Sequence, residues 1–378
     1  MSDAVTLDDR KTMCDFIMST TRYTSGEKVR EFEDRWSEWV GSKHSLMVSS
    51  GSTANFLLLA SIKELYNIPD GAKVLVPATT WVTNVSPVFQ MGLEPVFADI
   101  NLHDFSFNQD TLPPPDEDIA IIFVTYLLGF DTDTEYLRAR WPNALVIEDI
   151  CESHGVRGPT GARRGGGDSL GGTFSFYFGH HMTTIEGGIV STDNKELYDL
   201  MKLKRSHGMA RNLDPEPFRQ ACERHPDIDP QFLFLTDGYN FRSTDLNAVL
   251  GIEQLKRLDD VVEIRNHNFK MFCRVVKTHL DKLLPVEFND RCSNFAFPMI
   301  CKSPDILKRL KEELVKHEIE YRPIVSGNLL RHPFLAKWKD VRAPNADILN
   351  YQGVYIGNNQ FVSGEDLSHL DTILNSLS

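Results

Sequence analysis

Apolar residues recur at two different spacings along the first 258 residues of the chain, and the spacing changes from one segment to the next. Between Glu27 and Val40 they recur every three or four positions with charges between them, which predicts an amphipathic helix. Short apolar runs, typical of buried strands, then alternate with further helical segments. The predicted strands are SLMVSS, KVLVPA, EPVFADI, AIIFVTY, ALVIEDI and TFSFYF, and the later predicted helices cover 54–65, 82–90, 134–140, 194–205 and 244–258. This alternation predicts an α/β fold with a mostly parallel sheet covered on both faces.

The pattern changes near residue 259. A long charged helix is followed by a predicted strand at 294–300, a helix at 305–317 and a strand at 319–325. We therefore expect two domains, a large one with an N-terminal helix at 1–258 and a smaller α+β domain at 259–378, which suits a chain of 378 residues. The Gly-rich segment 158–172 is interpreted as a loop inside the first domain, because a strand pattern follows it at once.

The composition of the chain disfavours several kinds of partner and site. The net charge of −13 argues against a nucleic-acid partner or an anionic membrane surface, although local basic clusters leave a small anionic ligand open. The six cysteines are scattered without C-x-x-C spacing, which favours reduced thiols over a disulfide framework or a metal site. The acidic N-terminus has no apolar core of signal-peptide length, and no run approaches a membrane span. We expect a cytoplasmic protein.

Two short motifs place polar groups where strands end. In SSGSTAN (49–55) a strand enters a turn of small residues and a helix leaves it, so backbone N–H groups and the helix dipole converge on an anion site. A tight turn without a ligand is the alternative. In IEDICESHG (147–155), Glu148 and Asp149 lie at the end of a strand, where ligands bind in open α/β sheets. Such a carboxylate could pair with a cationic ring nitrogen or could cap a helix.

A third motif, SFYFGHHMTTIEGG (175–188), carries the adjacent histidines His180 and His181 between an aromatic strand pattern and a glycine turn. Consecutive residues on a strand point to opposite faces, so we expect at most one of the two to face a given pocket. A histidine that is simply packed in the core is the alternative for either.

Eight motifs in order, from SSGSTAN through PATTWVTN, EPVFADI, VTYLLG, VIEDICESHG, SFYFGHHMTTIEGG and RSHG to GYNFRSTDLNAVLG, cover residues 24–258 approximately. Together they resemble the sugar aminotransferases of the DegT/DnrJ/EryC1/StrS type. The resemblance implies the aspartate-aminotransferase fold (fold type I) and the cofactor pyridoxal 5′-phosphate (PLP) or its amine form, pyridoxamine 5′-phosphate (PMP), bound in the large domain.

The resemblance also implies how the cofactor phosphate is held. Backbone amides of Gly51, Ser52 and Thr53 would bind it, and Ser175 would add its hydroxyl group. Asn240, in GYNFR, would reach the phosphate of a neighbouring subunit, so the active site would require a homodimer.

Three further residues would contact the cofactor ring by the same resemblance. Trp81 would stack on the pyridine, Asp149 would keep the ring nitrogen protonated so that the ring acts as an electron sink, and Glu152 would reach the phenolic oxygen, a position usually held by Gln.

The chain departs from the family at one decisive position. Sugar aminotransferases carry the lysine that binds the cofactor covalently five residues after the phosphate-binding serine, and here that count leads from Ser175 to His180. Imidazole cannot make that covalent link, but it can act as an acid and base. The substitution resembles a subgroup of deoxysugar 3-dehydratases, and RPIVSGNLLRHP and GVYIGNNQ in the C-terminal domain add to this resemblance.

That subgroup implies removal of the C3 hydroxyl from a nucleotide-linked 4-keto-6-deoxyhexose, and GDP-4-keto-6-deoxymannose is the favoured substrate. His180 would act first as the base and then as the acid. L-Glutamate would regenerate PMP after each turnover. An offset of one in the count would exchange His180 for His181, to which we otherwise assign a structural role. The segment directly after RSHGMARN contains only Cys222 and no clustered ligands, so no metal and no iron–sulfur cluster is expected.

Arginines could bind the diphosphate or sugar through their bidentate guanidinium groups. The candidates are Arg205, Arg211, Arg322 and Arg331, for each of which a solvated or ion-paired surface role is the alternative. Two other functions compete with the dehydratase: a nucleotide-sugar aminotransferase that tolerates the missing lysine, and a catalytically inactive ligand-binding protein of the same fold. Retention of Trp81, Asp149, Ser175 and Asn240 argues against the inactive protein.

Overall fold

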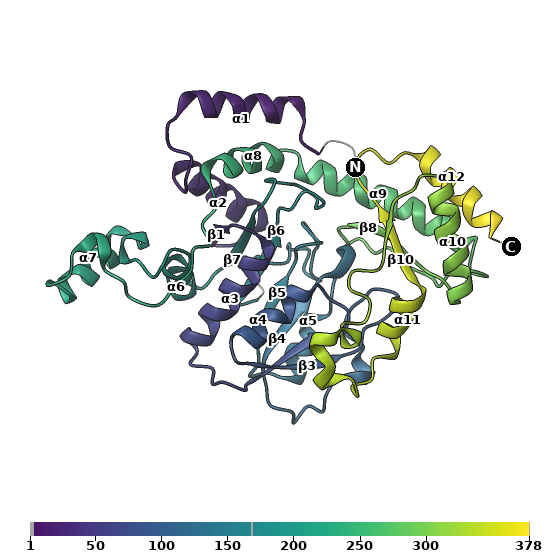
Figure 1. Cartoon of the computed structure of the whole chain (residues 1–378), viewed down its shortest axis with the longest axis horizontal. Coiled ribbons are helices and arrows are strands. Elements are labelled where there is room, and N and C mark those ends of the chain that lie inside the picture. The colour runs from purple at the N-terminus through teal and green to yellow at the C-terminus, as the bar shows by residue number, and fades with distance from the viewer. Residues whose placement is uncertain (1–3, 168, 378) are drawn as a thin grey trace.

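The large domain is built on a seven-stranded sheet in the order β1-β7-β6-β5-β4-β2-β3 (Figure 1). The computed structural model describes residues 4–167 and 169–377, so parts of the acidic N-terminus and of the Gly-rich segment 158–172 lie outside the described residues. The strands are β1 (His44–Val48), β2 (Lys73–Pro77), β3 (Glu94–Ala98), β4 (Ile119–Thr125), β5 (Leu145–Asp149), β6 (Gly171–Ser175) and β7 (Gly188–Thr192). Strands β6, β5, β4, β2 and β3 run parallel, whereas β7 pairs antiparallel with β6 and β1. The prediction of a mostly parallel sheet is confirmed.

Helices cover both faces of this sheet, as predicted. The helices of this domain are α1 (Leu7–Ser19), α2 (Glu27–Val40), α3 (Gly51–Leu65), α4 (Ser86–Gln90), α5 (Thr134–Arg140), α6 (Lys195–Arg205), α7 (Pro215–Arg224) and α8 (Asp245–Leu255). Residues of α2, α5 and α8 belong to one apolar core, and residues of α3, α4 and α6 to a second. Helix α7 projects away from the body of the molecule and rests on a small core of its own (Figure 1).

The smaller domain contains a three-stranded antiparallel sheet in the order β8-β10-β9. Its elements are α9 (Leu258–Lys277), β8 (Ala296–Ile300), α10 (Pro304–Lys316), β9 (Tyr321–Arg322), α11 (Pro344–Gln352), β10 (Gly353–Gly357) and α12 (Gly364–Ser376). The strand predicted at 319–325 is reduced to two residues, because Pro323 has no N–H group to continue the ladder.

Helix α9 joins the two domains. Leu258, at its start, packs into a core of the large sheet, whereas Phe269 and Phe272 pack into the core of the small sheet. The division after residue 258 therefore stays a prediction, since a single helix contributes to both cores. Within the described part of the chain, no helix combines the length and the apolar character that a membrane crossing needs.

Candidate functional site

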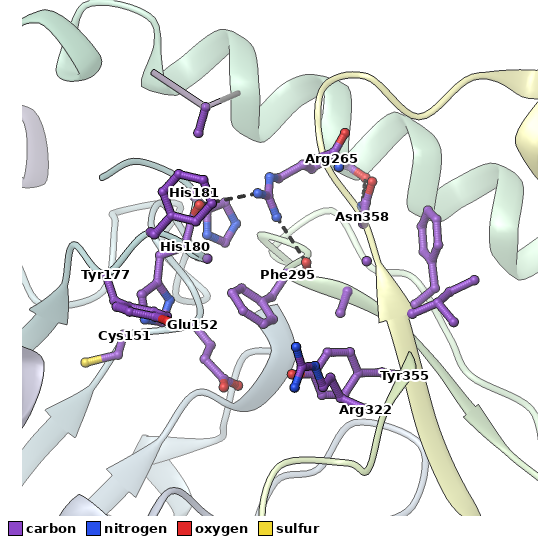
Figure 2. Close-up of a pocket in the computed structure, with 18 of the residues that line it drawn as sticks. Cys151, Glu152, Tyr177, His180, His181, Arg265, Phe295, Arg322, Tyr355 and Asn358 are labelled. Atoms are coloured by element: carbon purple, nitrogen blue, oxygen red, sulfur yellow. Dashed lines mark hydrogen bonds between the residues drawn. The ribbon is translucent and has the colours of Figure 1, made fainter. Parts of the chain in front are cut away.

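A cavity of about 1070 Å³ lies between the two domains. Its large-domain wall comes from the start of α3 and from the residues at and beyond the carboxyl ends of β4, β5 and β6. Its small-domain wall comes from the segment before β8 and from β9 and β10, with Arg322 and Tyr355 facing the cavity in Figure 2. The sequence motifs at the carboxyl ends of the strands therefore converge on this cavity, as expected for an open α/β sheet.

The start of α3 forms an anion cradle. Ser50 caps the helix by accepting a hydrogen bond from the N–H of Thr53 at 3.1 Å, and the N–H groups of Gly51 and Ser52 have no partner within the helix. A Cβ added at Gly51 would lie 2.6 Å from Cβ of Ser175 and 3.0 Å from Sγ of Cys151, so only glycine fits. Gly51, Ser52 and Ser175 line the cavity. The free N–H groups and the helix dipole suit a phosphate there.

Asp149 is a buried carboxylate without a cation of its own chain. It is 4% exposed at the end of β5, and its Oδ2 accepts hydrogen bonds from Nδ2 of Asn55 (2.8 Å) and Nδ2 of Asn84 (2.9 Å). Its Oδ1 accepts the N–H of Cys151 at 2.9 Å, and no helix begins there. No Lys, Arg or His among the described residues lies within ion-pair distance of it. A cationic ring nitrogen would supply the missing charge.

Glu148, the neighbouring carboxylate, points to the other side of β5. It is fully buried, and it accepts hydrogen bonds from the hydroxyl of Tyr126 (2.6 Å), the N–H of Gly165 (3.1 Å) and the hydroxyl of Ser169 (2.8 Å). Alternation along the strand therefore separates a structural carboxylate, Glu148, from the one that faces the cavity.

The two histidines both line the cavity, so the expectation that at most one would do so is wrong. The reason is that β6 ends at Ser175 and a turn follows, closed by a 3.0 Å hydrogen bond from the N–H of His180 to the carbonyl oxygen of Tyr177. Strand alternation does not apply in a turn. His181 is 4% exposed and its Nε2 lies 3.2 Å from Oγ of Ser293.

His180 has no hydrogen bond from its ring within the described residues. Its Nδ1 is shielded from solvent without a partner. Burial, aided by the positive charge of Arg265, lowers the pKa of His180 to about 3 and holds the pKa of His181 well below its ordinary range. Nδ1 of His181 is likewise unpartnered, but its Nε2 lies against Ser293, whereas no ring nitrogen of His180 has a partner among the described residues. This difference keeps His180 the predicted base.

Three other candidate residues lie in the same cavity. Trp81 is 54% exposed, which leaves its ring available to a flat ligand. Glu152 accepts the N–H of Leu128 at 3.0 Å, and burial raises its pKa to about 7, so this carboxyl can donate a proton near neutral pH. Arg322 contacts Glu320 at 3.2 Å on the cavity rim.

The remaining candidates do not line the cavity. The hydroxyl of Thr53 is bonded to Ser50. Arg205 donates to Oε1 of Glu33 at 2.6 Å, and Arg331 makes a bidentate contact with Asp347 at 2.7 Å. Arg211 and Asn240 are exposed outside the cavity, and the role of Asn240 toward a second subunit stays a prediction.

The structure adds residues that the sequence analysis did not single out. Asn55 and Asn84 orient Asp149, and Phe295 packs on His180 with ring centroids 5.5 Å apart. Arg265 reaches from α9 toward both histidines (Figure 2). The sequence does carry a signal for Arg265, because this charged residue lies between Val261 and Phe269 on the apolar face of α9.

These features fit a pyridine cofactor with a phosphate group. The cradle would take the phosphate, Asp149 would meet the ring nitrogen, and Trp81 would cover the ring, and these roles stay predictions. No lysine is among the described residues that line the cavity, so nothing there can bind the cofactor covalently through an amine. In the described ranges, no group of three or more His, Cys, Asp or Glu side chains is placed to hold a metal ion.

The chain is similar to known proteins over nearly its whole length. The sequence profile of the DegT/DnrJ/EryC1/StrS aminotransferase family matches residues 6–375. GDP-4-keto-6-deoxy-D-mannose 3-dehydratase of Yersinia pseudotuberculosis is 35% identical over 374 residues, which cover 95% of this chain and 93% of that protein.

Two solved structures share the fold. Escherichia coli GDP-4-keto-6-deoxy-D-mannose-3-dehydratase with bound hydrated PLP superposes with a TM-score of 0.88 at 29% identity, covering 99% of this chain and 98% of that one. GDP-4-keto-6-deoxymannose-3-dehydratase with a trapped PLP-glutamate geminal diamine superposes with a TM-score of 0.87 at 29% identity, covering 98% and 97%.

Proposed function

Since the chain belongs to the DegT/DnrJ/EryC1/StrS aminotransferase family, we propose that it is a PLP/PMP-dependent 3-dehydratase of a nucleotide-linked 4-keto-6-deoxyhexose. The observation that carries the proposal is the absence of lysine from the described lining of the cavity, together with the presence of His180 there. A transaminase needs an amine to bind and release its cofactor in each cycle. A protein with imidazole in that place keeps the proton chemistry and loses this route.

The substrate is GDP-4-keto-6-deoxymannose and the amino donor is L-glutamate. The relatives support both assignments, since they are described as dehydratases of this sugar and one was captured with PLP and glutamate. Arg322 is the candidate for the diphosphate or sugar that remains in the cavity.

The residues divide the work as follows. When bound, the cofactor would supply an electron sink for the C4 ketone of the sugar, so that loss of a proton is coupled to departure of the C3 hydroxyl. His180 takes that proton and, as imidazolium, returns it to the departing hydroxide. Asp149 fixes the charge of the ring nitrogen, and Gly51, Ser52 and Ser175 hold the phosphate in the cradle.

The protein acts as a homodimer in the cytoplasm, with Asn240 of each subunit serving the other subunit's phosphate site. Exposure of Asn240 outside its own cavity supports this arrangement, because the side chain is available to a second subunit.

A spectroscopic titration tests the function. Purified protein is mixed with PLP and treated with borohydride, and the expected result is no covalent attachment to the chain. In a separate sample without borohydride, L-glutamate should convert PLP to PMP with one equivalent of 2-oxoglutarate, and a His279→Gln variant, altered outside the residues that line the cavity, should behave identically. Covalent attachment of PLP to a lysine, or no binding of PLP, would contradict the proposal.

A further inference from the structure

Arg265 is a buried cation without a carboxylate partner. Its side chain comes from the middle of α9, is 4% exposed, and lines the cavity. No Asp or Glu of the described residues lies within ion-pair distance of it, whereas Arg257, the residue immediately before α9, lines the same cavity and pairs with Asp9. An unpaired buried charge costs free energy. A function of Arg265 in the site would explain why the protein tolerates this cost in free energy.

The guanidinium group instead holds two main-chain oxygens. Nη1 donates to the carbonyl oxygen of Phe295 at 3.0 Å, and Nη2 lies 3.4 Å from the carbonyl oxygen of His180, a long contact (Figure 2). Nε is buried without a partner. Asn358 fixes the helix at this point by donating to the carbonyl oxygen of Arg265 at 2.8 Å. Arg265 thus links the histidine turn of the large domain to the first residues of the small-domain sheet.

The surroundings of His180 contain no compensating negative charge in contact with it. Ring centroids lie 6.0 Å away for His154, 5.5 Å for Phe295 and 6.4 Å for Tyr177. The other titratable groups facing the cavity nearby are His181 on the same turn, Asp149, Cys151 and Glu152 beyond β5, and Arg322 and Tyr355 on the small sheet. No carboxylate of the described chain forms an ion pair with His180.

We propose that Arg265 is a positioning residue for the reaction: it fixes the main chain of His180 and holds a permanent positive charge in the cavity that His180 lines, which opposes lasting charge on the imidazole and speeds its return of the proton. The proposal rests on the proposed function, because it takes His180 as the group that moves the proton. The positive charge separates this role from simple packing. A neutral amide could donate to the same two carbonyl oxygens, so packing alone would not require a charged side chain.

The test compares Arg265→Gln, which keeps donors and removes the charge, with Arg265→Lys, which keeps the charge. The titration of His180 is followed by NMR in cofactor-free protein labelled at histidine nitrogen, with His180→Gln used to assign the signal. In wild type the His180 signal should stay that of neutral imidazole from pH 8 to pH 5. The titration is continued to pH 4, where Arg265→Gln should show a ratio of protonated to neutral ring at least about tenfold above the wild-type ratio, which corresponds to a midpoint higher by about one pH unit. Arg265→Lys should leave it near the wild-type position.

Arg257→Gln is the matched control, since that arginine lines the cavity but already has a carboxylate partner, and it should not move the His180 midpoint. An unchanged midpoint in a folded Arg265→Gln protein would overturn the proposal. If that variant does not fold, Arg265→Lys decides: a His180 midpoint at the wild-type position supports the proposal, and a midpoint about one pH unit higher despite the retained charge overturns it. The NMR readout needs neither cofactor nor substrate. A failure of the dehydratase function would therefore appear separately, as a wild-type protein that forms PMP but does not release ammonia from the sugar.

Discussion

The side-chain amide of Asn55, one turn into α3, donates a 2.8 Å hydrogen bond to Oδ2 of Asp149 at the end of β5. Asn84 donates to the same oxygen at 2.9 Å, and the hydroxyl of Thr173 on β6 donates to Oδ1 of Asn55 at 2.5 Å. The carboxylate that would meet the cofactor ring is therefore fixed by three segments of the large domain. Helix α3 both presents the phosphate cradle and orients the ring partner.

Asn55→Ala removes one of the two amide donors to Asp149. Hydrogen bonds to charged groups contribute about 1.5–3 kcal/mol, and each 1.4 kcal/mol is tenfold in affinity. We expect the dissociation constant of PMP to rise by about tenfold in a fluorescence titration. Asn375→Ala, a change in α12 outside the residues that line the cavity, should leave it unchanged, and an unaltered affinity in Asn55→Ala would show that Asp149 is held adequately without Asn55.

His180→Gln and His181→Gln separate the two histidines. Loss of a general acid–base group typically costs a factor of about 10²–10⁴ in rate. We expect that loss in the single-turnover dehydration rate of His180→Gln, with PMP affinity kept within about threefold. His181→Gln should lose less than about tenfold, because its ring is engaged with Ser293. The opposite ranking would make His181 the base.

His154→Leu tests the buried imidazole behind the site. His154 is fully buried with both ring nitrogens unpartnered, and an unsatisfied buried polar group costs about 1–3 kcal/mol. We expect the free energy of unfolding in urea to rise by about 1 kcal/mol at pH 7. His279→Leu, which removes the 2.8 Å contact between His279 and Asp371, should instead lower it.

The gain from His154→Leu should grow as the pH falls. Burial holds the pKa of His154 well below its ordinary value, so below about pH 6.5 the unfolded chain binds a proton that the folded protein does not. Wild type therefore loses stability through this window and the leucine variant loses less. Equal gains at pH 5 and pH 7 would contradict the account.

Glu152→Gln should change the pH dependence of stability in the other direction. The pKa of Glu152 is raised by burial to about 7, so its contribution to the free energy of unfolding is complete below about pH 4.5 and is lost as the pH rises through 7. Relative to wild type, the glutamine variant should gain on the order of 2 kcal/mol between pH 4.5 and pH 8. The free energy of unfolding is measured in urea with cofactor-free protein. Glu186→Gln, a change at an exposed residue of the cavity, is the control and should gain no stability.

The sequence predicted the architecture because its signals are local. Apolar runs and helical spacing were sufficient to place β2 and α2 and to anticipate the parallel sheet. Strand β7 was missed, because GIVST follows a glycine turn and has too few residues to show a period.

The site was only partly readable from the sequence. Motifs at strand ends located Gly51, Asp149, Ser175 and His180, whose convergence follows from parallel topology. The partners of these residues come from distant segments, and no local spacing indicates that Asn55 would meet Asp149. The turn that brings both histidines to the cavity was also hidden, since SFYF has the alternation of a strand that in fact ends at Ser175.

The central claim is tested most directly by the products of a single turnover. Protein loaded with PMP is mixed with GDP-4-keto-6-deoxymannose, ammonia is assayed, and the sugar is identified by mass spectrometry and NMR. The account predicts about one equivalent of ammonia per active site, within the precision of the assay, and a sugar that has lost its C3 hydroxyl. A stable 4-amino sugar without ammonia release would contradict it and would make the protein an aminotransferase.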